Sequence, residues 1–122
     1  MDARPVRDGV AGFIADLADF GVSAVTEGAV VRYDVTAPGG ARSGREVPTA
    51  VSVSELQPWP AAPPHWIHLP ADVRFDRTNA DQQEVLPGWQ RHSRDIAQWN
   101  SVGHPGQRWL AHVRRVISEI AA

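Results

Sequence analysis

The sequence contains no cysteine and no lysine. The missing cysteine excludes disulfide bonds, thiolate metal ligands and thiol nucleophiles. The missing lysine excludes Schiff-base chemistry and a lysine general base, and all 12 basic side chains are arginines. Codon bias in a GC-rich bacterial genome is the simpler explanation of this usage. The other explanation is that a chain without lysine offers no side-chain amine for self-modification in a conjugation pathway.

A basic charge excess and a long apolar run are also lacking. The formal net charge is -2, which gives no nucleic-acid footprint and no polybasic membrane patch. The apolar runs are a few residues long, whereas a membrane span needs roughly 20, and the charged start lacks the apolar region of a secretory signal. We therefore expect a soluble cytoplasmic protein that binds neither membrane nor nucleic acid. Its 122 residues fit a single domain, 1–122.

Two segments have the periodicity of amphipathic helices. Apolar residues at helical spacing predict a helix over 8–20, with Asp8 as N-cap, Asp16 and Asp19 facing solvent, and Gly21 ending it. A second helix is predicted to begin at Pro105, because proline suits the first turn. Its apolar stripe consists of Trp109, Val113, Val116, Ile117 and Ile120.

Between these segments the period changes to two, which indicates half-buried strands. Strands are predicted over 22–26, 31–36 and 47–53, and a fourth over 65–69. Consecutive strands joined by short loops favour an antiparallel meander. The predicted fold class is therefore α+β, with a four-stranded meander sheet flanked by N- and C-terminal helices.

Two irregular stretches interrupt this pattern. Residues 57–64 hold four of the ten prolines, and the Trp59–Pro60 bond is predicted to be either cis or part of a stiff trans linker. Residues 71–103 are polar without clear periodicity, which is typical of a functional or poorly ordered segment. A short helix is predicted over 95–99.

This order of elements, with the Trp-Pro-Ala-Ala-Pro-Pro turn at 59–64 before a strand, resembles the ubiquitin-conjugating-enzyme (UBC) fold. The Trp-x-Arg-x-Ser-Arg stretch at 89–94 is similar to a bacterial branch of that superfamily. The resemblance covers almost the whole chain. It implies the meander with its proline-rich corner, and a place in a ubiquitin-like conjugation pathway.

The sequence departs from this family at its catalytic centre. The family carries a ubiquitin-like protein as a thioester on cysteine, and this chain has no cysteine. The His-Pro-Asn motif of the family is missing as well, since the His-Pro pair at 104–105 is followed by Gly106. The resemblance therefore implies a non-thioester protein that binds a ubiquitin-like protein or an activating enzyme.

Ser93 is the candidate for a hydroxyl nucleophile that would form an oxyester. Such a hydroxyl needs a base, and His92 is the neighbouring candidate, although adjacent residues of a strand point apart. The alternative is that Arg91, Ser93 and Arg94 are structural residues of the long loop.

The other histidines offer weaker site hypotheses. On a strand His65 and His68 would face opposite sides and could not share a metal easily, although Asp72 or Asp76 could pair with one of them. His104 and His112 are predicted to be a helix cap and a core-boundary residue. No metal and no cofactor is predicted.

The chain has five tryptophans: Trp59, Trp66, Trp89, Trp99 and Trp109. Most of them are expected to hold the long loop on the sheet, because aromatic burial is large. A minority could form a binding patch, since Trp and Arg are frequent in interface hot spots. The predicted partner-binding residues are Trp59, Trp89, Arg91 and Arg94.

Three functions remain open from the sequence. The first is the UBC-like binding protein, with an oxyester-forming variant that uses Ser93. The second is a general interaction or chaperone-type module unrelated to ubiquitin-like chemistry. The third is a small hydrolase using His65 or His92, which needs a pocket where a histidine meets a carboxylate.

Overall fold

The structure is a computed structural model that describes residues 8–75, 80–81, 87–93, 96, 99 and 103–122. Its helices are α1 (Gly9–Ala18), the short 3-10 helix η1 (Val53–Leu56) and α2 (Pro105–Ser118). Its strands are β1 (Val25–Glu27), β2 (Val30–Thr36), β3 (Glu46–Ser52), β4 (Trp66–Pro70), β5 (Ala80–Asp81) and β6 (Trp89–Ser93). The α+β class predicted from the sequence is confirmed.

The strands form one antiparallel sheet with the order β1-β2-β3-β4-β6-β5. The four predicted strands correspond to β1 to β4. The prediction of only four strands is wrong, because β6 pairs with β4 along its whole length and β5 pairs with β6. Both added strands come from the segment that was expected to be irregular. The short helix predicted over 95–99 falls largely outside the described residues.

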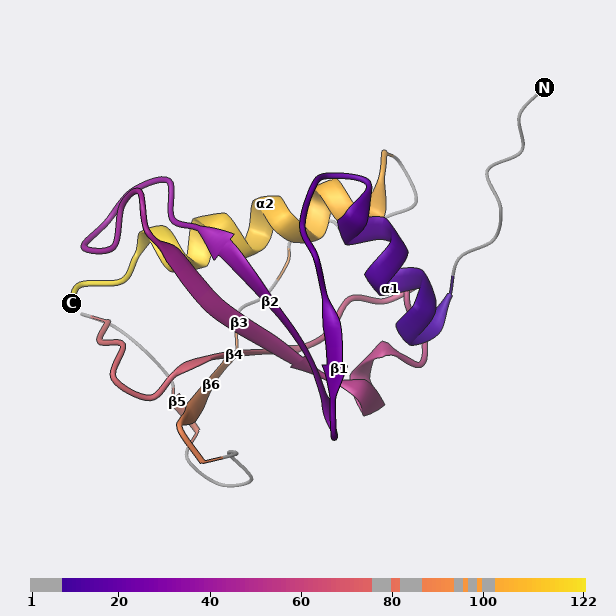
Figure 1. Cartoon of the computed structure of the whole chain (residues 1–122), viewed down its shortest axis with the longest axis horizontal. Coiled ribbons are helices and arrows are strands. Elements are labelled where there is room, and N and C mark those ends of the chain that lie inside the picture. Colours follow the sequence, from indigo (N-terminus) through magenta and orange to yellow (C-terminus); the bar gives the residue numbers. More distant parts are fainter. Residues whose placement is uncertain (1–7, 76–79, 82–86, 94–95, 97–98, 100–102) are drawn as a thin grey trace.

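Both helices cover the same face of the sheet. Side chains of α1 and α2 pack in one cluster with alternate residues of β2 and β3. In Figure 1, α1 lies beside the first turn of α2, and the end of α2 lies beside the loop that joins β2 and β3. The centre of this cluster is formed by Phe13, Leu17, Val31, Tyr33, Val35, Val47, Val51, Trp109, Leu110, Val113 and Ile117.

Asp16 corrects one prediction for the first helix. It was expected to face solvent, but it is fully buried, and its carboxylate accepts a hydrogen bond of 3.0 Å from Trp59 Nε1. A buried carboxylate is costly unless it is hydrogen-bonded. Trp59 supplies this partner from 43 positions along the chain, which helical periodicity does not reveal.

The proline-rich corner joins η1 to β4, and its Trp59–Pro60 bond is cis, one of the two predicted forms. The Trp59 ring is fully buried and meets Phe13 edge-on at 4.9 Å between ring centroids. Trp99 packs on Trp59 at 5.5 Å and donates a 2.9 Å hydrogen bond to the Pro60 carbonyl. Trp59 therefore holds the corner against α1, and Trp99 packs on Trp59. None of the helices in the described part of the chain is long and apolar enough to cross a membrane.

Candidate functional site

The face of the sheet opposite the helices, here called the open face, carries a group of polar and aromatic side chains. Ile67 and Leu69 of β4 point into the core, so Trp66 and His68 between and beside them lie on the open face. The register places Trp66 opposite Ser93 and His68 opposite Arg91. These four residues come from β4 and β6, both of which follow the proline-rich corner in the chain.

Ser93 forms a hydrogen bond with a histidine on this face. Its Oγ lies 2.8 Å from His65 Nε2. His92, the base suggested by the sequence, is fully buried on the opposite face, and its Nε2 lies 3.0 Å from Gln90 Oε1. Strand alternation separates His92 from its neighbour, so the structure brings His65 to the serine instead.

Glu55 of η1 fixes the place where β4 begins. Its two carboxylate oxygens accept hydrogen bonds from the backbone N–H groups of His65, at 3.0 Å, and Trp66, at 3.2 Å. Charge-assisted bonds of this kind are stronger than neutral ones. They hold the backbone from which the His65 ring reaches Ser93.

A stack of three side chains lies next to this pair. The Arg91 guanidinium carbon sits 4.0 Å from the centre of the Trp66 ring, a cation–π arrangement. The His65 ring meets the same indole edge-on, with 4.9 Å between centroids and 89° between planes. Trp66 was not among the predicted site residues. Its position would follow from the sequence only if β6 and its register with β4 were known.

His68 lies on the open face but has only 4% of its surface exposed. Burial lowers its pKa below the ordinary value, since the charged form loses its hydration. A hydrogen bond with the Ala50 backbone and the charge of Glu55 act in the opposite direction, and Arg91 adds to the lowering. The net shift favours the neutral form of His68, which lies between Ala50 and Arg91 in the sheet.

A buried polar network holds the chain that follows β4. Gln90 Nε2 donates to the carbonyls of Pro70, at 2.9 Å, and Val73, at 2.8 Å. Its Oε1 meets His92, whose ring packs on Phe75 at 4.7 Å. These contacts give Gln90 and His92 structural roles in the core, away from the open face.

The other predicted partner residues have different surroundings. Trp59 is buried in the core, so its side chain is not accessible to a partner. Trp89 and Arg91 are half-buried at the open face. Arg94 lies outside the described residues. Asp72 forms an ion pair of 3.6 Å with Arg42, and Asp76 is not described.

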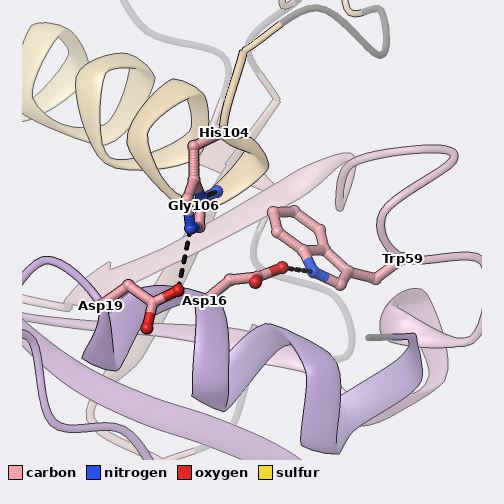
Figure 2. Close-up of polar contacts among 5 residues, drawn as sticks. All are labelled: Asp16, Asp19, Trp59, His104 and Gly106. Atoms are coloured by element: carbon pink, nitrogen blue, oxygen red, sulfur yellow. Dashed lines mark hydrogen bonds and ion pairs between the residues drawn. The ribbon is translucent and has the colours of Figure 1, made fainter. Parts of the chain in front are cut away.

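A second polar cluster lies where the two helices meet (Figure 2). It contains Asp16 and Asp19 from the end of α1 and its flank, and His104 at the N-cap of α2. One ligand-type atom from each residue lies within 4.8 Å of the others. A metal ion could bridge atoms at this spacing. The hydrogen bonds of His104 decide whether the cluster is a metal site or a helix cap.

His104 uses both ring nitrogens within the protein. Nδ1 accepts a 3.0 Å hydrogen bond from the Gly106 backbone N–H, so the proton of the neutral ring is on Nε2, 2.9 Å from Asp19 Oδ2. A metal on Nε2 would move that proton to Nδ1, where it would face the Gly106 N–H. The cap geometry therefore opposes a metal ion, and the predicted capping role of His104 is confirmed.

His112 is buried against the Trp109 ring, with 5.5 Å between centroids. This position agrees with the core-boundary prediction, and Arg108 lies one turn before it on α2. Neither residue belongs to the open-face group.

Comparison of the chain with protein-family models, with curated proteins and with solved structures gave no match.

Proposed function

We propose that this chain is a UBC-like domain that binds a ubiquitin-like protein or its activating enzyme without forming a thioester. The observation that supports this most is the proline-rich corner between β3 and β4 of an antiparallel sheet. Helices before and after the sheet cover one face of it, as the resemblance implies. The lack of cysteine limits the role to one that needs no thiol.

The open face is the surface that we assign to the partner. Tryptophan and arginine dominate interface hot spots because they combine a large contact area with directional hydrogen bonding. The Trp66–Arg91 stack provides both in one place, and Trp89 lies on the same side of β6. The exposed residues Arg32 and Asp34 of β2 extend this face across the sheet.

A binding measurement with paired variants tests the proposal. The ubiquitin-like protein and the activating enzyme of the same genome would each be titrated into the protein by calorimetry. We expect Arg91→Ala to weaken binding at least tenfold, which corresponds to about 1.4 kcal/mol. Arg114→Ala, an exposed arginine of α2, is the control and should leave the affinity unchanged.

The result also separates the alternative function. A general interaction or chaperone-type module would suppress the aggregation of an unfolded test protein and would bind neither pathway component. That outcome, or equal weakening by both arginine variants, would contradict the proposal. Genes for an activating enzyme or a ubiquitin-like protein beside this one would support it.

A further inference from the structure

We propose that Ser93 and His65 form an acyl-accepting site, with Ser93 as the nucleophile and His65 as its general base. The observation that supports this proposal is the 2.8 Å separation of Ser93 Oγ and His65 Nε2. This distance is within the range expected for a nucleophile and its base. The ligand class is an activated carboxylic acid derivative, such as an aryl ester or an acyl adenylate. This inference goes beyond the binding function and does not depend on it.

The two side chains are held by contacts on both sides of the pair. Ser93 lies in the β4–β6 ladder, directly opposite Trp66. His65 is fixed at its backbone by Glu55, and its ring is held by the edge contact with Trp66. Ser93 lies on a strand, which keeps its geometry better than a loop does. His65 lies just before β4 and depends on its contacts with Glu55 and Trp66.

The pair is also accessible to a reactant. His65 is exposed and Ser93 is half-exposed, so an ester can approach Oγ from solvent. The His92–Gln90 pair has a similar distance but is fully or almost fully buried. Accessibility therefore favours Ser93 over the buried side of the same strand.

The reaction is an ordinary acyl transfer. Ser93 Oγ attacks the carbonyl carbon while His65 Nε2 takes the hydroxyl proton, and the carbonyl oxygen becomes negatively charged. The bond from carbon to the leaving oxygen then breaks, and the imidazolium returns its proton to the leaving group. Water then attacks the carbonyl carbon of the acyl-serine while His65 Nε2 takes its proton. The bond from that carbon to Ser93 Oγ breaks and Oγ receives the proton, which releases the carboxylic acid and restores the serine.

Arg91 supplies a positive charge for this step. It lies two positions before Ser93 on the same face of β6, and its guanidinium is fixed over Trp66. A positive charge near the carbonyl oxygen stabilises the negative charge that develops there. We expect Arg91→Gln to slow acylation while leaving the Ser93–His65 pair in place.

The first experiment uses p-nitrophenyl acetate. We expect a burst of p-nitrophenolate equal to the amount of protein, with the acetyl group found on the peptide that contains Ser93. Ser93→Ala should remove the burst, and His65→Gln should slow it at least hundredfold, in line with the effect of a general base. Ser54→Ala, an exposed serine of η1, is the matched control and should keep the wild-type burst.

The second experiment uses the absence of cysteine. Ser93→Cys introduces a single thiol, whose alkylation by iodoacetamide is measured with and without His65→Gln. We expect the histidine to accelerate alkylation at least tenfold by drawing the proton from sulfur. Equal alkylation rates in the two proteins, or acetylation of wild-type protein at other residues with none on Ser93, would overturn the proposal. Circular dichroism of each variant shows that it is folded.

Discussion

At the scale of single residues, two buried hydrogen bonds between side chains join residues that lie far apart in the sequence, Trp59 with Asp16 and Trp109 with Tyr33. Trp109 Nε1 donates a 2.8 Å hydrogen bond to the Tyr33 hydroxyl, across 76 positions. Burial raises the pKa of Tyr33, while the bond from Trp109 acts in the opposite direction. The hydroxyl therefore stays neutral, and the bond fixes α2 against β2.

His68 makes the stability of the fold depend on pH. Burial lowers its pKa in the folded state, so the unfolded chain binds more protons, and stability rises with pH. The contribution is complete above the unfolded value of 6.5 and is lost as the pH falls below it. We expect the free energy of unfolding in urea to decrease between about pH 7 and pH 5.

His68→Gln, which cannot be protonated in this range, should reduce that decrease. Measurements of both proteins at pH 8 give the change in the free energy of unfolding that the substitution causes independently of pH. Glu55 and Arg91, the charges that act on His68, remain in both proteins. An identical pH dependence in the variant would show that His68 is not the group responsible.

At the scale of elements, the sequence predicts those whose buried positions are apolar. The regions of α1, β2, β3 and α2 follow from periodicity because the residues facing the core are mainly Val, Leu, Phe and Trp. Strand β6 has the same alternation of burial, but its buried side chains are Gln90 and His92. Since hydrophobic periodicity cannot recognise a strand whose core face is polar, β6 was missed. Asp16 was misplaced for the same reason.

The candidate site was predictable in part. Ser93 was singled out from its basic neighbours, and the cap at His104 followed from its place before Pro105. The partner of Ser93 could not be predicted, because His65 reaches it only through the register of β4 with β6. That register depends on the strand with the polar core face.

The contact between α1 and α2 depends on the lack of a side chain at Gly106. A Cβ at this position would overlap the backbone oxygen of Asp16 and would lie 2.8 Å from its carbonyl carbon. We expect Gly106→Ala to lower the free energy of unfolding by about 1–3 kcal/mol, because the helices must separate. Gln107→Ala, exposed on the same turn, is the control. A Gly106→Ala protein as stable as this control would contradict the close approach.

At the scale of the whole molecule, three distant segments meet at the end of α2 (Figure 1). The Ile120 carbonyl accepts a hydrogen bond of 3.0 Å from Ala41 N–H, in the loop between β2 and β3. Arg74, after β4, exchanges backbone hydrogen bonds with Ala121 and Ala122. The segment after α2 therefore ties the loop and the chain beyond β4 into one unit.

Gly40 is the tightest point of this junction. Its φ is 79°, and an added Cβ would overlap the Ser118 carbonyl oxygen, with the carbonyl carbon at 2.9 Å. Gly44, in the same loop, has a φ of 81°, and a Cβ there would meet nothing within 4 Å. Gly44→Ala should cost about 1–2 kcal/mol from backbone strain alone. Gly40→Ala should cost about 1–3 kcal/mol more from overpacking.

Urea unfolding followed by both tryptophan fluorescence and circular dichroism measures the two glycine variants. If the junction belongs to the cooperative unit, both signals shift together by the same amount in Gly40→Ala. Equal losses in Gly40→Ala and Gly44→Ala would mean that the loop moves away from Ser118 at no cost. The segment after α2 would then unfold independently, and its hydrogen bonds to Ala41 and Arg74 would not stabilise the rest of the fold.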